Sequence, residues 1–247
     1  MSPFTLGGRT ILITGASSGI GRAAAILCAE MGASLIITAR NEERLAGTLD
    51  SLSGTGHKMI TADLADESEI SRLVEQSPPL DGLVNNAGMI ELLPSEYVTR
   101  EKLDEILSVN TYAPITLFAG LARKRKLRKG CSVVFTSSLA GNVVTAYGHS
   151  MYSVSKAAVS AFAKTAALEM APRKIRVNCV CPGMIETGLI HSEKVTPEML
   201  AEDVKRYPLR RYGKPEEVAG GIAFLLSDAA SFITGINLII DGGMTLV

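Results

Sequence analysis

Short apolar runs alternate along this chain with longer stretches in which apolar residues recur at helical spacing. The apolar runs are rich in aliphatic and β-branched residues, a composition typical of strands. They predict strands at Thr10–Thr14, Ser34–Ala39, Lys58–Ala62, Gly82–Asn85, Ser132–Thr136, Arg176–Val180 and Asn237–Ile240. Several runs are almost continuously apolar, as expected of parallel strands that are buried on both faces. The alternation therefore predicts an α/β fold, in which helices cover both faces of a parallel sheet.

The stretches between the predicted strands carry start signals of helices. Asp66-x-x-Glu69 matches a capping box, in which two side chains satisfy backbone N–H groups at a helix start. Lys214-Pro215 places proline in a first helical turn, where its missing N–H is not needed. In sheets of this kind ligands bind outside the carboxyl ends of the strands, so the residues that follow each strand are the candidates for a binding site.

The composition favours one large domain and gives no sign of a membrane or nucleic-acid partner. The 247 residues suit a single α/β domain over 1–247, and 47% hydrophobic residues suffice for a sizeable core. Basic and acidic residues balance at 25 each, so no global charge points to nucleic acid or an anionic membrane. The longest apolar runs have strand length, and we expect neither a signal peptide nor a membrane span. The four cysteines lack zinc-ligand spacing, so we expect reduced thiols, a cytoplasmic location and no metal site.

A glycine-rich turn follows the first predicted strand. It reads Gly15-Ala16-Ser17-Ser18-Gly19-Ile20-Gly21, and an alanine-rich helical stretch follows it. Glycines let the backbone turn tightly and approach a pyrophosphate, which a helix N-terminus binds through free N–H groups. The spacing differs from the commoner Gly-x-Gly-x-x-Gly, and a turn that serves packing alone is the alternative. We predict a dinucleotide phosphate site, with Ser17 and Ser18 as hydroxyl donors.

The end of the second predicted strand bears on the choice between NAD(H) and NADP(H). A site for NAD(H) usually has an acidic residue here for the ribose 2′-hydroxyl, but this chain has Ala39 and then Arg40. An arginine at this place can bind a 2′-phosphate, which favours NADP(H). The alternative is a surface arginine that caps the next helix beside Glu43. Asp63, at the end of the third strand, either contacts adenine or hydrogen-bonds the following turn.

Tyr152 and Lys156 are the strongest candidates for chemistry. They lie four residues apart in a helical stretch, and this spacing places both side chains on one face. A lysine ammonium beside a phenol favours the phenolate and lowers the pKa of the tyrosine. A tyrosine tuned in this way exchanges protons near neutral pH, as an acid or a base. Taken alone, the pair also fits a surface tyrosine beside a solvated lysine.

Four motifs, which include this pair and the glycine-rich turn, follow one another in a fixed order along the chain. They are Thr14-Gly-x-x-x-Gly-x-Gly21, Asn85-Asn86-Ala87-Gly88, Ser138 ahead of Tyr152-x-x-x-Lys156, and Pro182-Gly183. With them, essentially the whole chain resembles the classical short-chain dehydrogenase/reductase family. The resemblance implies a Rossmann-type, doubly wound, seven-stranded parallel sheet with the strand order 3-2-1-4-5-6-7. It also implies an oxidoreductase that interconverts a ketone and a secondary alcohol.

The resemblance further implies four catalytic residues. Tyr152 would exchange a proton with the substrate oxygen, and Ser138 would hydrogen-bond that oxygen. Lys156 would bind the nicotinamide ribose and keep the pKa of Tyr152 low, while Asn110 would hold a water that links Lys156 to solvent. Ser138 lies fourteen residues before Tyr152, one more than in the commonest family form, so Ser137 is a second candidate. We prefer Ser138, because the sequence from it to Gly141 matches the family pattern.

The same resemblance assigns the cofactor site. The nicotinamide would lie against residues that follow the fourth and sixth strands, and Thr187 would reach its carboxamide or the phosphates. The complete set of expected cofactor-binding residues is Gly15, Ser17, Ser18, Gly19, Ile20, Gly21, Arg40, Asp63, Leu64, Asn86, Ala87, Gly88, Tyr152, Lys156, Pro182, Gly183, Ile185 and Thr187.

The family binds substrates with the loops beyond the strand ends. Here these are 89–94, 139–150 and 184–209, and their apolar side chains predict a largely apolar pocket with 184–209 as a mobile helical lid. The resemblance leaves three functions open. They are a 3-oxoacyl carrier-protein reductase, a dehydrogenase of a steroid, sugar or other small alcohol, and a non-catalytic NADP(H)-binding sensor.

The basic run Arg123–Lys129 is the one strong cluster of charge. It fits a solvated helix end, where cations interact favourably with the helix dipole. It also fits a docking site for acyl carrier protein, because the family's carrier-protein reductases receive that partner on basic residues at the positions of Lys129 and Arg173. The resemblance implies a homotetramer or homodimer that acts on a small-molecule carbonyl or alcohol.

Overall fold

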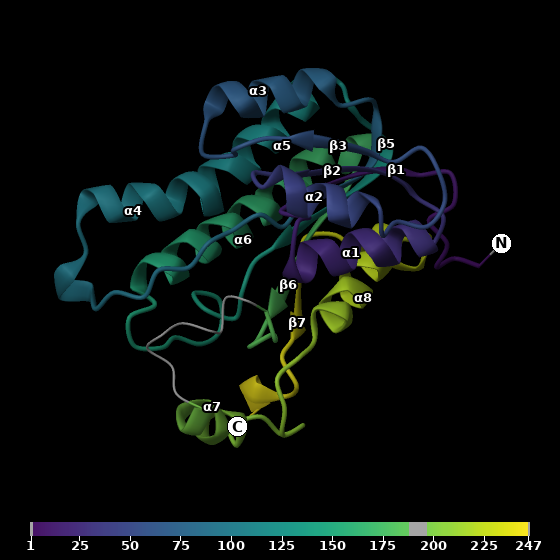
Figure 1. The fold of residues 1–247 in the computed structure, drawn as a ribbon. Helices are drawn as coiled ribbons and strands as arrows, with labels where there is room; N and C mark the ends of the chain where they lie inside the picture. The colour runs from purple at the N-terminus through teal and green to yellow at the C-terminus, as the bar shows by residue number, and fades with distance from the viewer. Residues whose placement is uncertain (1, 188–196, 247) are drawn as a thin grey trace.

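The computed structural model describes residues 2–187 and 197–246, and it confirms the predicted fold class. Within these residues seven strands form one parallel sheet in the order β3-β2-β1-β4-β5-β6-β7, as the family resemblance implied (Figure 1). The order reverses between β1 and β4, which makes their carboxyl ends the place where such folds bind ligands. The strands are β1 (Thr10–Thr14), β2 (Ser34–Ala39), β3 (Lys58–Thr61), β4 (Leu80–Asn85), β5 (Leu127–Thr136), β6 (Arg176–Pro182) and β7 (Asn237–Ile240).

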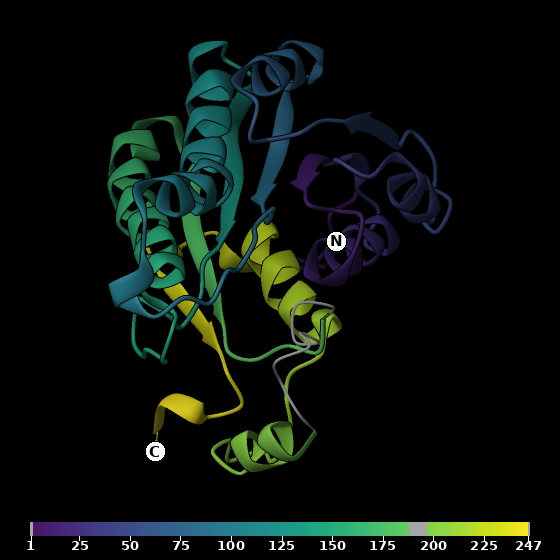
Figure 2. The ribbon, with the colours of Figure 1, turned by 60° about the vertical axis from the view of Figure 1, so that its left-hand side comes forward.

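Helices cover both faces of this sheet (Figures 1 and 2). On one face α1 and α8 pack side by side, and on the other α3, α5 and α6 form the cover. Helix α2 packs on the β2–β3 end, α4 contacts α6, and α7 lies beyond the carboxyl ends of the strands. Their bounds are α1 (Gly19–Glu30), α2 (Glu42–Leu49), α3 (Glu67–Gln76), α4 (Arg100–Leu107), α5 (Ala113–Arg123), α6 (Ser150–Met170), α7 (Pro197–Val204) and α8 (Pro215–Leu226).

Two apolar cores, one on each face of the sheet, hold the layers together. Successive residues of β1 show why both form, because side chains alternate between the faces of a strand. Ile11 and Ile13 enter the core beneath α1 and α8, and Leu12 enters the core beneath α3, α5 and α6. All three are fully buried. Burial of each such side chain contributes roughly 1.5–3 kcal/mol, so β1 stabilises both layers at once.

Three strands are longer than the sequence predicted, and β3 ends one residue earlier than predicted, at Thr61. Strand β4 begins at Leu80 instead of Gly82, because Leu80 pairs with Leu127 of β5. Strand β5 begins at Leu127 instead of Ser132, since Leu127 pairs with Leu80 before an irregularity shifts the register. The basic residues of the run made this first part resemble a helix end. Strand β6 continues to Pro182, because its last residues still pair with β7.

The predicted helix starts are partly confirmed. Asp66 is the N-cap of α3, and its carboxylate accepts the Ser68 N–H at 2.8 Å. The reciprocal half of the capping box is wrong, because Glu69 accepts the N–H of Asp63, three residues further back. At α8, Pro215 begins the helix as predicted.

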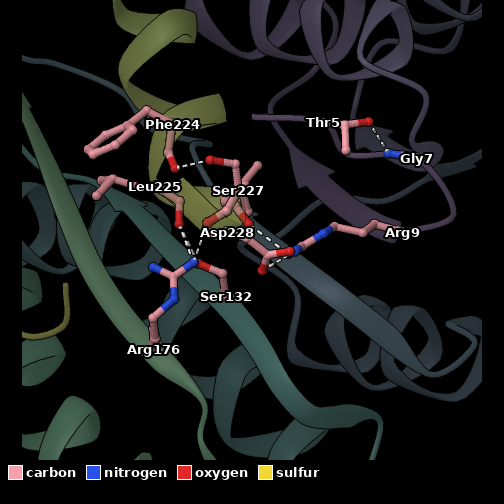
Figure 3. Close-up of polar contacts among 10 residues, drawn as sticks. Thr5, Gly7, Arg9, Ser132, Arg176, Phe224, Leu225, Ser227 and Asp228 are labelled. Carbon is pink, nitrogen blue, oxygen red and sulfur yellow. Dashed lines mark hydrogen bonds and ion pairs between the residues drawn. The ribbon is translucent and has the colours of Figure 1, made fainter. Parts of the chain in front are cut away.

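The N-terminal edge of the sheet is fastened to the end of α8 by two arginines (Figure 3). Arg176 donates to the carbonyl oxygens of Leu225 at 2.7 Å and Ser227 at 3.0 Å. Arg9 donates to the Leu226 carbonyl at 2.8 Å and pairs with Asp228 at 2.6 Å. The last carbonyls of a helix lack partners within the helix, and cations are favoured there by the helix dipole. These contacts therefore fix α8 to β1 and β6 at the edge opposite the carboxyl ends.

Candidate active site

The turns after β1 and β4 close on each other. The hydroxyl oxygen of Thr14 accepts the backbone N–H groups of Asn86 at 2.9 Å and Ala87 at 3.0 Å. A Cβ on Gly15 would lie 2.8 Å from the Cα of Ala87, and one on Gly21 only 2.2 Å from the Gly15 carbonyl oxygen. Such distances exclude any side chain, so the glycine motif is required for the approach of these backbones.

The N-terminus of α1 has free donors. Ser18 is the N-cap residue, but its side chain makes no capping hydrogen bond, and the first turn has no acidic residue. Gly19 has a positive φ of 52°, Thr187 lies against it, and both residues line a hollow of about 410 Å³. An anion binds favourably where the N–H groups at a helix start have no hydrogen-bond partner, and the hydroxyls of serine and threonine can add donors. The residues present therefore fit the pyrophosphate of a dinucleotide.

The end of β2 presents one unpaired cation. Arg40 is exposed, and among the described residues its side chain has neither a hydrogen bond nor an ion pair. Asn41, instead of Arg40, caps α2, because its side-chain oxygen accepts a backbone N–H there at 2.8 Å. The Asp63 carboxylate accepts the N–H of Ala65 at 3.0 Å, which matches the turn contact considered for it. Among the described residues Arg40 thus has no protein partner.

Tyr152 faces Ser138 across the carboxyl end of β5. Burial raises the pKa of Tyr152 above the usual 10.0, and a hydrogen bond with the Ser138 side chain acts in the opposite direction. The expectation of a lowered pKa is therefore wrong for these residues as they stand. The Ser138 hydroxyl oxygen also accepts the Ala140 N–H at 3.1 Å, which leaves its own proton to donate. At neutral pH the pair is a protonated phenol beside a hydroxyl donor.

Lys156 lies one turn after Tyr152 in α6. Its amine is 5.8 Å from the centre of the Tyr152 ring and donates to the Thr136 carbonyl oxygen at 2.9 Å. Burial lowers the pKa of Lys156 from 10.5 to about 8. The amine is thus turned toward β5, and burial of the phenol is the largest influence on the pKa of Tyr152.

Asn110 lies in a π-helical turn, Ser108–Tyr112, between α4 and α5. Its carboxamide makes two hydrogen bonds with the backbone of Met89. The oxygen accepts the Met89 N–H and the nitrogen donates to the Met89 carbonyl, both at 2.8 Å. The nitrogen also donates to the Ser155 hydroxyl at 3.0 Å. A Cβ on Gly88 would meet the Asn110 oxygen at 3.2 Å and the Lys156 amine at 3.3 Å. Asn110 thus fixes the turn after β4 directly beside Lys156.

The geometry separates the two candidate serines. Ser137 is buried, with 2% of its surface exposed, and its hydroxyl donates to the Lys156 carbonyl oxygen at 3.0 Å. It also contacts the hydroxyl of Ser160 at 2.7 Å and accepts from the side chain of Asn142 at 3.0 Å. Ser137 is therefore saturated with protein partners, whereas Ser138 faces Tyr152.

The segment after β6 borders the same edge. Gly183 donates its N–H to the Ile240 carbonyl at 3.0 Å, and Pro182 accepts the Leu139 N–H at 3.2 Å. Ile185 is buried, and half-buried Thr187 ends the described part of this segment. Of the predicted lid, 184–187 and 197–209 are described, and they include α7; 188–196 lie outside the described residues, and the mobility of the lid stays a prediction. A hollow of about 340 Å³ lies next to the Ser138 loop, lined by Val143, Val144, Arg206, Met244 and Thr245.

The predicted docking residues lie at the other edge of the sheet. Lys129 is exposed in the first part of β5, and Arg173 follows the end of α6, where it donates to the Leu127 carbonyl. Tyr152 is in the first turn of α6, a helix of 21 residues. At roughly 1.5 Å per residue the helix is about 30 Å long, so this distance separates the basic residues from the chemistry.

Sequence reasoning assigned no role to three residues at the carboxyl ends of the strands. Thr14 holds the turn after β4, the carbonyl of Thr136 receives the Lys156 amine, and the Asn142 side chain bonds both serines. Thr14 and Thr136 are the last residues of their strands, which was an available signal. Asn142 lies in the lengthened loop, and no motif marks it.

The described residues contain neither a metal-binding cluster nor a membrane-spanning helix. Among residues 2–187 and 197–246, no cluster of His, Cys, Asp or Glu side chains is suited to hold a metal ion. No helix in the same ranges has the length and apolar character needed to cross a membrane.

Comparison with known proteins gives a consistent result. A family model described as enoyl-(acyl carrier protein) reductase matches residues 15–245. An uncharacterized oxidoreductase of Thermotoga maritima is 37% identical, over 97% of this chain and 98% of its own. The 3-oxoacyl-acyl-carrier-protein reductase FabG of Rickettsia felis is 35% identical, over 98% and 99%. A solved structure from Beutenbergia cavernae, described as a candidate NAD(P)-dependent gluconate 5-dehydrogenase with NADP bound at low occupancy, is 32% identical, with a TM-score of 0.90 over 100% of both chains.

Proposed function

This chain belongs to the short-chain dehydrogenase/reductase family of NAD(P)(H)-dependent oxidoreductases, and from that membership we propose that it interconverts a ketone and a secondary alcohol with NADP(H). The observation that carries the proposal is the arrangement of three side chains, because Tyr152 lies beside Ser138 and the Lys156 amine is 5.8 Å from the centre of the Tyr152 ring. A phenol that stays protonated at neutral pH can give a proton to a carbonyl oxygen. We take residues 1–247 as one catalytic domain.

Each catalytic residue has a task in the reduction. When bound, the nicotinamide supplies a hydride to the carbonyl carbon. Tyr152 gives its proton to the carbonyl oxygen, and Ser138 donates a hydrogen bond to the same oxygen, where negative charge develops. Lys156, whose amine now bonds the Thr136 carbonyl, would hold the ribose hydroxyls, and its positive charge would favour the phenolate that remains. In the oxidative direction Tyr152 acts as the base.

Asn110 serves proton exchange in this scheme. Its carboxamide oxygen approaches the same face of Gly88 as the Lys156 amine and keeps a second lone pair. A water held there would link Lys156 to solvent. Because Asn110 also hydrogen-bonds the backbone of Met89, it fixes the turn after β4 that would line the cofactor.

The cofactor would lie along the carboxyl ends of β1, β2, β4 and β6. Free N–H groups of α1 and the hydroxyls of Ser17, Ser18 and Thr187 suit the pyrophosphate. Arg40 suits a 2′-phosphate, because it is an exposed cation with no protein partner among the described residues. This supports NADP(H) over NAD(H). The further contacts in the proposed site are Gly15, Gly19, Ile20, Gly21, Asp63, Leu64, Asn86, Ala87, Gly88, Pro182, Gly183 and Ile185.

Two substrate classes have support. The Rickettsia felis relative favours a 3-oxoacyl chain on acyl carrier protein, and the Beutenbergia cavernae structure favours a sugar acid or another small alcohol. A carrier docked on Lys129 and Arg173 would be about 30 Å from Tyr152 along α6. If the carrier docks there, the group that links it to the 3-oxoacyl chain must span that distance. Otherwise the substrate must enter the active site of a second copy of the chain that lies closer.

We also propose a homotetramer or homodimer in the cytoplasm. The apolar side chains of Leu168 on α6 and Phe232 before β7 are 78% and 104% exposed, which suits contact with another copy. The buried free cysteines suit a reducing compartment. Sedimentation as a stable monomer would contradict the assembly.

The decisive experiment measures NADPH and NADH oxidation with acetoacetyl carrier protein, free ketones, and keto-sugars and keto-acids. We expect Tyr152-dependent turnover with NADPH on at least one carbonyl. Fastest turnover of the carrier-bound substrate would select the carrier-protein reductase, and turnover of free ketones or keto-sugars alone would select the small-alcohol enzyme. Tight NADPH binding without turnover on the whole panel would contradict catalysis and favour a sensor.

A further inference from the structure

The side chain of Asn142 bonds the backbone of the catalytic serine. Its nitrogen donates to the Ser138 carbonyl oxygen at 2.8 Å and to the Ser137 hydroxyl at 3.0 Å. One carboxamide group therefore holds the peptide that follows Ser138 and the residue that precedes it. Both contacts are short, and Asn142 is half-buried, so water competes weakly for them.

This contact continues into the helix that carries the other catalytic residues. The Ser137 hydroxyl donates to the backbone carbonyl of Lys156 at 3.0 Å and contacts the Ser160 hydroxyl at 2.7 Å. The carbonyl of Ser138 is thus tied, through Asn142 and Ser137, to the turn of α6 that contains Lys156. Tyr152 lies one turn earlier in the same helix.

Asn142 is itself held from two sides. The side-chain nitrogen of Asn237 in β7 donates to its carboxamide oxygen at 3.3 Å. Next to it, Gly141 has a positive φ of 82°, and a Cβ there would lie 2.1 Å from the Ser153 carbonyl oxygen of α6. The loop therefore sits directly on the helix, and Asn142 has little freedom to leave its partners.

We propose that Asn142 is a positioning residue that fixes the Ser138 hydroxyl relative to the Tyr152 phenol. The inference rests on the proposed function, because it assigns Asn142 an effect only through Ser138. Rotation of the peptide after Ser138 would move its hydroxyl and the Ala140 N–H that the hydroxyl oxygen accepts. The direction in which the Ser138 hydroxyl points, toward Tyr152 or away from it, therefore depends on that peptide. Small displacements of a reacting group lower rates strongly.

A double-mutant cycle tests the coupling. In Asn142→Ala we expect kcat to fall about tenfold, with the KM of the carbonyl substrate and the Kd of NADPH each changed less than about twofold. In a Ser138→Ala background the same change should lower kcat less than about twofold further, because the serine that it positions is gone. Equal losses in both backgrounds would overturn the inference, since a general structural defect acts without Ser138.

Two further variants separate positioning from folding. Asn142→Asp keeps the side-chain volume and can still accept the hydrogen bond from Asn237. Its carboxylate cannot donate to the Ser138 carbonyl oxygen, so we expect a loss of kcat as large as in Asn142→Ala. Asn237→Ala removes only the 3.3 Å contact and should lower kcat less than about twofold. Full kcat in Asn142→Asp would overturn the inference. If Ser138→Ala itself kept full turnover, the role of the serine in the proposed function would fail, and the inference with it.

Discussion

The N-terminal ends and the carboxyl ends of the strands use polar side chains in opposite ways. At the N-terminal ends of the strands, Arg128 and Asp81 are paired at 2.6 Å, and Arg176 is bonded to the end of α8. At the carboxyl edge the described residues leave Arg40 without a partner and bury the amine of Lys156. The contrast is strongest at Asn85, which ends β4 with 5% of its surface exposed and has no partner for either side-chain polar atom.

This difference separates stability from function. Buried polar groups in native proteins are nearly always hydrogen-bonded, because an unpaired one destabilises the fold. Of the described buried side-chain atoms without partners, those of Thr38, Asn85, Ser150 and Ser153 belong to the ends of β2 and β4 and the start of α6, around the candidate site. Departures from local satisfaction are expected where a protein binds or reacts. Mutations at the two edges should therefore change different measured quantities.

Tyr152→Phe should give the largest effect at the carboxyl edge. Removal of the phenolic hydroxyl takes away the proton donor, so we expect kcat to fall by about 10²–10⁴-fold while the Kd of NADPH changes little. Tyr147→Phe is the matched control, because Tyr147 is 86% exposed in the neighbouring loop. Steady-state kinetics and fluorescence titration measure both quantities. Turnover close to wild type in Tyr152→Phe would refute the assigned proton donor.

Arg176→Met should give the largest effect at the N-terminal edge. It removes donors to the carbonyls of Leu225 and Ser227, so we expect the free energy of unfolding to fall by about 2–4 kcal/mol. The KM and the Kd of NADPH should stay within about twofold. Urea unfolding measures the change, and Arg100→Met, at a side chain 81% exposed, is the control. A loss of cofactor affinity with unchanged stability would reverse the comparison.

Arg40→Ala should weaken NADPH binding without affecting the fold. The lost contact is a charge-assisted bond to the 2′-phosphate, so we expect about a 10–100-fold rise in the Kd of NADPH, or about 1.4–2.8 kcal/mol. The Kd of NADH should change much less. Arg123→Ala makes the same change of charge at the end of α5 and serves as control. An equal loss for both dinucleotides would remove the case for phosphate recognition.

The effect of pH on Lys156 should be the smallest and has a definite sign. The folded pKa of about 8 lies below the ordinary 10.5, so above pH 8 the unfolded chain binds more protons and the free energy of unfolding rises with pH. Lys156→Met lacks this rise and should be more stable than wild type near pH 7, by a margin that shrinks toward pH 10. Urea unfolding of both proteins between pH 7 and 10 tests this, and the cysteines common to both cancel. A margin that grows with pH would contradict a buried, charged lysine.

The sheet could be predicted from the sequence because its strands are apolar on both faces. β1, β2 and β7 have the predicted bounds, since their apolar runs end where their pairing ends. The start of β5 could not be predicted in this way. Its first residues are basic, and they are strand only because Leu127 pairs with Leu80, a contact 47 residues away in sequence. Pairing that depends on such distant partners leaves no local pattern.

The candidate site was predictable where motifs mark it. Tyr152 and Lys156 lie close together as their helical spacing predicted, Ser138 lies beside Tyr152 as the family resemblance implied, and the Ser137 side chain bonds α6 instead. The raised pKa of Tyr152 was not predictable. Helical spacing indicates that Lys156 is near, but it does not reveal the burial of the phenol that raises the pKa. Nor was Asn142, whose partners are known only once the loop is seated on the helix.

The tight approach of Gly21 to Gly15 has a consequence for how relatives are interpreted. A methyl group at Gly21 would lie 2.2 Å from the Gly15 carbonyl, so the backbone itself forbids other residues, with or without a cofactor. A descendant that lost its catalytic activity would still have to inherit this glycine. The glycine motif therefore diagnoses ancestry and fold. A change at Ser138 or Tyr152 is the more informative sign that a relative has ceased to be an enzyme.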